Sequence, residues 1–131
     1  SQSGVKIGLL IRGICAVQPG IVGLSENIEV KSILGRFLEH SRILHFVNGG
    51  DDEYWIGSAD LMGRNLDRRV EALVQVDKKE HKMRLQGLLD DGLSDLTCSW
   101  HLKQSQWTRH NNGCQDLHEL LIDRHTSERT S

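Results

Sequence analysis

This 131-residue chain has no long apolar run, a single proline and a formal net charge of only −2. The longest apolar stretches, such as residues 7–11, are too short to cross a bilayer, so we expect no membrane-spanning segment. Lys and Arg number 16 against 18 Asp and Glu, which argues against a non-specific nucleic-acid or membrane coat but allows one local basic pocket. Hydrophobic residues make up 37%, enough for a core in one domain of this length.

Cysteine is also scarce. Cys15, Cys98 and Cys114 are odd in number and widely spaced, so the sequence predicts no disulfide framework and favours a reducing cytoplasm. The first four residues carry neither the charged nor the apolar region of a signal peptide. They also lack Met, which indicates a processed or excised chain.

The hydrophobic pattern predicts an α/β fold with a mixed sheet flanked by helices. The apolar run at residues 5–11 is nearly continuous, which is typical of a strand covered on both faces. The Asn-Gly-Gly-Asp-Asp sequence at residues 48–52 predicts the turn of a hairpin. Strands are expected over residues 5–11 with a continuation to 17, and over 28–34, 42–47, 53–57, 69–74, 97–102 and 106–108.

The clearest helix is predicted over residues 77–93. Asp77 is suited to accept hydrogen bonds from the free amides at its start. One helical face carries five leucines, namely Leu85, Leu88, Leu89, Leu93 and Leu96. We also expect a helical turn over residues 35–40, and a terminal helix over 115–125 that ends in a frayed tail at 126–131.

Cationic side chains follow or interrupt several apolar elements. These candidates are Arg12, Arg36, His40, Arg42, Arg64, Arg68 and Arg69. Arg12 lies in a run that is otherwise predicted to be buried, so its charge needs a partner. That partner is either a carboxylate of this chain (Glu26, Glu39 or Glu71) or an anionic ligand. Arginine suits phosphate because its planar fork forms two parallel hydrogen bonds.

His40 is the candidate for acid–base chemistry. A histidine beside a short turn is usually a surface or packing residue. Neighbouring arginines would favour its neutral form, because positive charge opposes protonation. A neutral imidazole next to phosphate acts as nucleophile or general base, and its protonated form acts as an acid.

A second group of polar residues has the chemistry of metal ligands. It consists of Cys98, His101, His110, Cys114 and His118. The spacings match no zinc signature, and Asn111-Asn112-Gly113 breaks any helix between His110 and Cys114. We therefore predict no metal site and interpret these residues as ordinary surface polar groups, with a zinc-binding module kept as an alternative.

Several segments occur in an order that resembles a known family. Together they resemble the C-terminal catalytic domain of the large polyphosphate kinase family over about residues 1–95, with a looser likeness to residue 107. Residues 1–109 are accordingly interpreted as a C-terminal phospholipase D-like domain, and residues 110–131 as a C-terminal extension with a helix and a tail. The segments are Gly4-Val5-Lys6-Ile7, Ile11-Arg12-Gly13-Ile14-Cys15, Gly23-Leu24-Ser25-Glu26-Asn27-Ile28, Gly35-Arg36-Phe37-Leu38-Glu39-His40-Ser41-Arg42, Asn48-Gly49-Gly50, Gly57-Ser58-Ala59-Asp60 and Arg64-Asn65-Leu66-Asp67-Arg68-Arg69-Val70-Glu71.

The resemblance implies a set of site residues. Members of the family have four domains, of which the last two are similar to phospholipase D halves, and this chain looks like a truncated single domain, the final one. Arg12 matches an ATP-contacting arginine, and His40 matches the second essential histidine, which is also an ATP-site residue. Arg69 and Glu71 match a basic–acidic pair at the active site. The phosphorylated histidine, the magnesium ligands and the adenine-stacking tyrosine belong to the preceding domain, so no metal ligand is assigned here.

The function implied is reversible transfer of the terminal phosphate of ATP to polyphosphate, through a phosphohistidine in an upstream domain. The implied partners are ATP, ADP, polyphosphate, Mg²⁺ and the remaining domains of a parent enzyme that forms a homo-oligomer in the cytoplasm, with membrane association left open. No nucleic-acid partner is expected. The fragment is expected to be inactive alone.

The phospholipase D relationship suggests one alternative reaction. His40-Ser41-Arg42 keeps the histidine of a His-x-Lys motif, Val47 stands at the position of its acid, and Asp60 stands where an asparagine is usual. The missing acid argues against phosphodiester hydrolysis. A phosphodiesterase half-site that pairs two copies of His40 in a dimer therefore stays an alternative, as does a non-catalytic anion- or zinc-binding module.

Overall fold

The computed structural model describes residues 2–33 and 35–130, which divide into two compact units. The terminal unit comprises residues 1–39 and 90–131, and the central unit comprises residues 40–89. Each unit contains one β-sheet and is described by itself. The predicted α/β fold with a mixed sheet and helices is confirmed.

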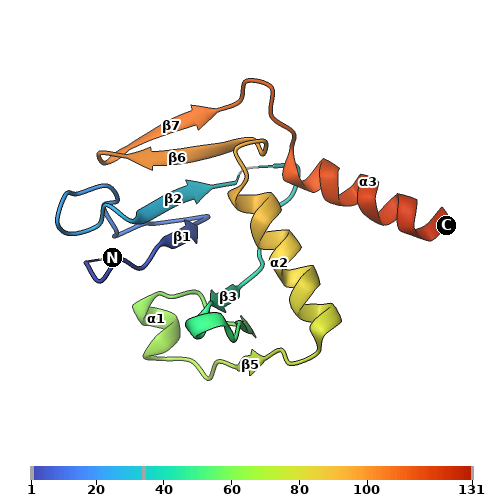
Figure 1. The fold of residues 1–131 in the computed structure, drawn as a ribbon, viewed down its shortest axis with the longest axis horizontal. Coiled ribbons are helices and arrows are strands. Elements are labelled where there is room, and N and C mark those ends of the chain that lie inside the picture. The colour runs from blue at the N-terminus through green and yellow to red at the C-terminus, as the bar shows by residue number, and fades with distance from the viewer. Residues whose placement is uncertain (1, 34, 131) are drawn as a thin grey trace. The chain divides into compact units, whose positions relative to one another are not determined.

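The sheet of the terminal unit has four strands in the order β1-β2-β6-β7 (Figure 1). Strand β1 pairs with β2 in parallel, whereas β2–β6 and β6–β7 are antiparallel, so the sheet is mixed. Val30 of β2 and Leu102 of β6 are buried in its core. The strands are β1 (Ile7–Leu10), β2 (Ile28–Ser32), β6 (Ser99–Lys103) and β7 (Gln106–His110).

Two glycines let helix α2 (Lys79–Leu93) approach this sheet closely at its last turn. A Cβ atom on Gly92 would lie 2.6 Å from Leu10 Cδ1, and one on Gly8 would lie 3.0 Å from Leu93 Cδ1. The last helix of the terminal unit, α3 (Leu117–Thr130), extends away from the sheet (Figure 1). The close contact between helix and sheet therefore depends on two positions that lack a side chain.

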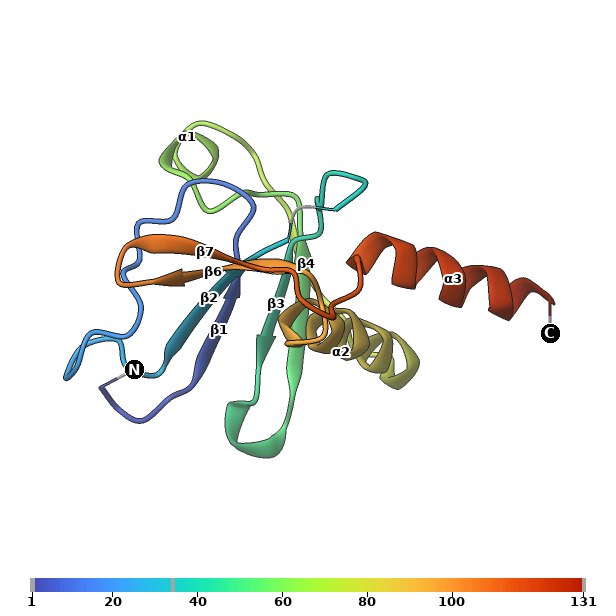
Figure 2. The ribbon, with the colours of Figure 1, turned by 90° about the horizontal axis from the view of Figure 1, so that it is seen from above.

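The central unit is built on the antiparallel sheet β3-β4-β5. Strands β3 (Ile43–Phe46) and β4 (Glu53–Gly57) form the predicted hairpin, visible side by side in Figure 2. The turn contains the short 3-10 helix η1 (Asn48–Gly50), where Gly49 has φ 69° and Gly50 has φ 104°. Such backbone angles favour glycine and explain the Gly-Gly pair. Strand β5 (Leu73–Gln75) follows the four-residue helix α1 (Gly63–Leu66).

Several predicted element boundaries are wrong. Strand β2 ends at Ser32, β6 begins at Ser99, β7 ends at His110 and α3 begins at Leu117. The first strand ends at Leu10 and does not reach residue 17, and Ile14 is 88% exposed. The strand predicted over residues 69–74 is Leu73–Gln75, and the helix predicted from residue 77 begins at Lys79. Residues 126–130 continue helix α3 instead of fraying, because Thr126 and Thr130 hydroxyls donate back to carbonyls one turn earlier. The predictions for residues 34 and 131 lie outside the described residues.

The helical turn predicted over residues 35–40 is also wrong, since residues 35–40 are irregular. The reason is a tertiary contact that replaces the local helical bonds. The backbone amide of Phe37 donates to His118 Nδ1 at 3.2 Å, and a Cβ on Gly35 would lie 2.4 Å from that nitrogen. Helix α3 therefore fixes this irregular segment through His118.

The expectation that the chain has no disulfide is wrong as well, because Cys98 and Cys114 are bonded to each other. The bond joins the start of β6 to the segment before α3. Two backbone hydrogen bonds of 2.9 Å reinforce it, from Cys98 to Gln115 and from Gln115 to Leu96. In the described residues, no helix has the length and apolar character needed to cross a membrane.

Candidate active site and a closed charge cluster

One edge of the central sheet gathers residues that are distant in sequence. Antiparallel pairing sets the end of β4 between the start of β3 and the start of β5. The amide of Gly57 donates to the Arg42 carbonyl at 3.1 Å, and the amide of Ser58 donates to the Ala72 carbonyl at 3.0 Å. The segment Ser58-Ala59-Asp60 therefore lies between the His-x-Arg motif and the stretch that holds Glu71.

His40 contacts the guanidinium of Arg42 at this edge. Nη1 of Arg42 lies 2.8 Å from Nδ1 of His40, and Nη2 lies 3.3 Å from Nε2. The Nε–H of the same guanidinium donates to Asp60 Oδ1 at 3.1 Å. His40 is exposed, whereas Arg42 and Asp60 are half-buried. The result is an imidazole at the surface with a charge pair directly behind it.

Glu71 is held at this edge by Ser58. Its carboxylate accepts a hydrogen bond of 2.5 Å from the Ser58 hydroxyl, which in turn accepts from the Ala72 amide at 3.0 Å. Arg69 is exposed in the loop between α1 and β5. The same short segment thus holds Glu71 through Ser58 and Arg42 through Asp60.

Arg12 belongs to the terminal unit and follows β1 in a bend. The prediction that it interrupts a buried strand is wrong, because the strand ends two residues earlier and the Arg12 residue is half-buried. Ile11, its neighbour, extends the β1–β2 pairing by donating to the Lys31 carbonyl at 2.9 Å. The backbone leading into Arg12 is therefore fixed by the sheet.

The other candidate arginines are at the surface. Arg36 forms an ion pair with Glu119 at 3.1 Å, and its guanidinium lies 5.5 Å from the centre of the Phe37 ring. Arg64 and Arg68 are exposed in and after helix α1. Arg36 is thus paired with a carboxylate of this chain.

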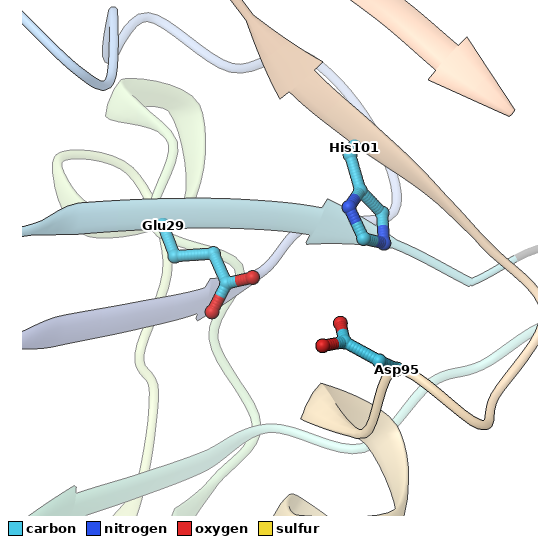
Figure 3. A group of neighbouring side chains, drawn as sticks. All are labelled: Glu29, Asp95 and His101. Atoms are coloured by element: carbon cyan, nitrogen blue, oxygen red, sulfur yellow. The ribbon is translucent and has the colours of Figure 1, made fainter. Parts of the chain in front are cut away.

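A second cluster of charged groups lies in the terminal unit, and its acidic and histidine members are drawn in Figure 3. Glu29 of β2, Asp95 and His101 of β6 offer ligand atoms that lie within 4.8 Å of one another. The Lys31 ammonium is 2.8 Å from Asp95 Oδ1 and 3.1 Å from Glu29 Oε1, and it donates to the Leu93 carbonyl at 2.6 Å. The ammonium therefore already supplies the cation of this group.

The charges of this cluster stabilise one another. Burial opposes the charge of Lys31, but hydrogen bonds and attraction from Asp95 and Glu29 outweigh it and raise the pKa of Lys31. The hydrogen bond from Lys31 lowers the pKa of the Asp95 carboxyl. Burial, followed by the charges of Lys31 and His110, lowers the pKa of His101. His101 is thereby held neutral beside a charged Lys31.

The candidate metal ligands do not assemble into a site. Cys98 and Cys114 are joined by a disulfide and offer no thiolate. His118 is buried, which corrects its interpretation as a surface residue; its Nδ1 contacts the backbone of Phe37. Among residues 2–33 and 35–130, the group around Glu29 is the one with metal-binding geometry, and the Lys31 ammonium would repel a cation there. The described residues therefore do not fit Mg²⁺ or Zn²⁺.

Comparison with known proteins defines the class. The chain matches the family described as Polyphosphate kinase C-terminal domain 2 over residues 1–119. It is 54% identical over 129 residues to a polyphosphate kinase of Streptomyces coelicolor, covering 94% of this chain and 17% of that protein. It is 51% identical over 131 residues to the Mycobacterium leprae polyphosphate kinase, covering 97% of this chain and 18% of the relative.

A solved structure agrees. The crystal structure of polyphosphate kinase from Porphyromonas gingivalis matches 99% of this chain and 21% of that chain, with a TM-score of 0.87 at 32% identity. The chain therefore belongs to the polyphosphate kinase C-terminal domain family and has its phospholipase D-like α/β fold. It spans less than a fifth of the length of these two curated relatives. The match runs beyond residue 109, and the boundary we drew there stays a prediction.

Two residues of the central edge were absent from the predicted site. Ser58 and Asp60 contact Glu71 and Arg42, respectively. The sequence contained a signal for Asp60, because a carboxylate stood where the phospholipase D pattern has an asparagine. It contained no signal for Ser58, whose contact depends on the pairing of β4 with β5.

Proposed function

We propose that this chain forms part of the active site of a polyphosphate kinase, which transfers the terminal phosphate of ATP reversibly to polyphosphate. The observation that carries the proposal is the exposed His40 ring against the Arg42 guanidinium, 2.8 Å apart, in a chain of this family. In the proposed reaction a phosphohistidine in an upstream domain carries the phosphoryl group. Mg²⁺ and its ligands belong to that upstream part, and the parent is a cytoplasmic homo-oligomer.

Each predicted residue has a role that suits phosphoryl transfer. Such transfer depends on positioning the groups and neutralising charge on the phosphoryl oxygens. Arg12 binds an ATP phosphate through its planar fork. His40 exchanges a proton with the transferring group or steadies it by a hydrogen bond, and the exposed Arg69 adds positive charge. The Glu71 carboxylate, which accepts from the Ser58 hydroxyl, is the acidic member of the pair that it forms with Arg69.

This assignment explains how a chain of net charge −2 would bind a polyanion. Under the proposal the positive charge is local and comes from His40, Arg42 and Arg69, and the Asp60 and Glu71 carboxylates at the same edge are engaged by Arg42 and Ser58. The phosphorylated histidine is not in this chain under the proposal. The isolated chain is therefore expected to make no polyphosphate.

The test uses an intact enzyme. A hybrid enzyme is made in which this chain replaces the matching segment of the Streptomyces coelicolor polyphosphate kinase, to which it is 54% identical. We expect the hybrid to synthesise polyphosphate from ATP. His40→Ala should lower the rate at least about 100-fold, the lower range for a lost acid–base group. Arg12→Ala should also lower the rate, because it removes a cation that binds the ATP phosphate. Polyphosphate is measured by its release of phosphate after acid hydrolysis.

Matched controls use residues outside the proposed site. Arg109→Ala and His81→Ala remove an exposed arginine and an exposed histidine, and both should leave the rate unchanged. A folded hybrid that makes no polyphosphate contradicts the proposal. A rate for Arg12→Ala or for His40→Ala that equals the parent rate contradicts it as well. Synthesis by the isolated chain would contradict its predicted inactivity.

A further inference from the structure

We infer that Asp60 is a positioning residue for His40 and acts through Arg42, an inference that rests on the proposed function of His40. Three side chains form one line of contacts. Asp60 Oδ1 accepts from Arg42 Nε at 3.1 Å, and Nη1 of the same guanidinium lies 2.8 Å from His40 Nδ1. The effect of Asp60 on His40 passes through one rigid group.

The guanidinium transmits orientation because it is planar. Its five N–H bonds point in fixed directions, so anchoring the Nε edge also sets the direction of the Nη donors. A lysine at position 42 would carry the charge but no such fork. The choice of Arg in the His-x-Arg motif is therefore explained by the need to reach Asp60 and His40 together.

Asp60 itself is anchored by its backbone. Its carbonyl accepts from the Met62 amide at 2.8 Å and from the Asn65 side-chain amide at 3.3 Å. Asn65 lies in helix α1 and is only 3% exposed. The carboxylate thus extends from a turn that is fixed at two points, which is what a positioning group requires.

Partial burial makes the ion pair a stronger anchor than a surface pair. The side chains of Arg42 and Asp60 are 21% and 28% exposed, so water screens their attraction less than it screens an exposed pair. His40, in contrast, is exposed. The half-buried pair contacts the ring from behind while the ring is accessible to a ligand.

The same contact assigns the tautomer of His40. An arginine has donors only, so a ring nitrogen that accepts from it must carry no proton. The shorter of the two contacts is at Nδ1, and we therefore assign the proton of the neutral ring to Nε2.

A rival interpretation makes different kinetic predictions. If Arg42 bound phosphate and Asp60 merely neutralised it, removing the carboxylate would free the guanidinium and lower KM for ATP. If Asp60 positions His40, removing the carboxylate lowers kcat and leaves KM for ATP unchanged. The split between kcat and KM therefore separates the two.

The first arm of the test is kinetic and uses the hybrid enzyme. Asp60→Asn keeps the shape and removes the charge, and we expect kcat to fall at least about tenfold, since small misplacements of reacting groups cost up to about 100-fold. The kcat of the Arg42→Lys variant should fall by a similar factor, because lysine retains the charge but lacks the planar fork of donors. Asp51→Asn, which changes an exposed carboxylate in the β3–β4 turn, should match the parent.

The second arm needs no activity and uses ¹⁵N NMR of the 131-residue chain. We expect one His40 tautomer, protonated at Nε2, and slow solvent exchange of the Arg42 Nε proton. In Asp60→Asn the exchange should quicken and the tautomers should become mixed, with circular dichroism unchanged.

The two arms keep the two ideas apart. If the hybrid is inactive but these NMR changes are observed, the proposed function is contradicted while the role of Asp60 in positioning His40 is supported. The positioning is overturned by Nδ1 protonation in the parent chain, by NMR signals that Asp60→Asn leaves unchanged, or by a lower KM with unchanged kcat.

Discussion

Leu10 occupies the space that a side chain at position 92 would need: a Cβ atom on Gly92 would lie 2.6 Å from Leu10 Cδ1 and 3.4 Å from Ile33 Cδ1. Strand β1 and the last turn of helix α2 are thereby packed at a distance that only glycine allows. Five residues earlier on the same helix, a Cβ on Gly87 would meet nothing within 4 Å. The two glycines therefore form a natural pair for comparison.

Gly92→Ala should lower the free energy of unfolding by about 1–3 kcal/mol, because the added methyl forces Leu10 off its position in a packed core. Gly87→Ala should raise it by about 0.5–1 kcal/mol, because alanine loses less backbone entropy in a helix. Urea denaturation followed by circular dichroism measures both. Equal effects of the two substitutions would contradict the packing described for β1 and α2.

The disulfide between Cys98 and Cys114 should stabilise the chain by limiting its unfolded state. With a separation of 16 residues, the expected contribution is about 3 kcal/mol by the loop-entropy estimate. Cys98→Ser with Cys114→Ser should lower the Tm, and a reducing agent should lower the parent Tm to the same value. Cys15→Ser, at the free cysteine, is the control and should change neither. A Tm insensitive to reductant would count against the bond.

The stability of the chain should depend on the two carboxylates that neutralise the buried Lys31 ammonium, those of Glu29 and Asp95. Glu29→Gln with Asp95→Asn leaves a buried ammonium with the Leu93 carbonyl as its strongest partner, so the Tm should fall. Adding Lys31→Met to that pair removes the isolated charge and should restore most of the loss. Thermal unfolding of the double and triple variants measures this. A triple variant less stable than the double one would contradict the prediction.

Stability should also fall on mild acidification, in part because of His101. Burial and the nearby Lys31 charge lower its pKa in the folded chain. The unfolded chain therefore binds more protons at this site just below the ordinary histidine pKa of about 6.5, and the free energy of unfolding falls as pH decreases there. His101→Gln should flatten this dependence between about pH 7 and about pH 5. His81→Gln, at an exposed histidine, should leave the slope unchanged.

Local patterns predicted the elements whose causes are local. The Asn-Gly-Gly turn indicated the β3–β4 hairpin, and the leucine spacing indicated helix α2. Helix α1 was missed because four residues are too few to show a periodicity. The irregular path of residues 35–40 was missed because its cause, the ring of His118, lies 81 residues from Phe37 in the sequence.

The candidate site follows the same rule. His40, Arg69 and Glu71 were predicted from a resemblance of ordered motifs and stay predictions, whereas the Ser58 and Asp60 contacts required the strand register. The failure at Arg12 had the opposite origin. An apolar sequence suggested burial, but the strand stopped early because Ile14 and its neighbours have no sheet partner to pack against in the described chain.

The pairing of β2 with β6 has a consequence for biosynthesis. Ser32 is opposite Trp100, so the whole central unit is translated between the two strands that meet there. During translation, β2 has an open hydrogen-bonding edge until residue 103 leaves the ribosome, and such an edge invites pairing with other nascent chains. The strands of the central unit pair with near neighbours in the sequence, so this unit is able to fold before β6 is synthesised. The central unit therefore folds early, and the sheet of the terminal unit is completed late.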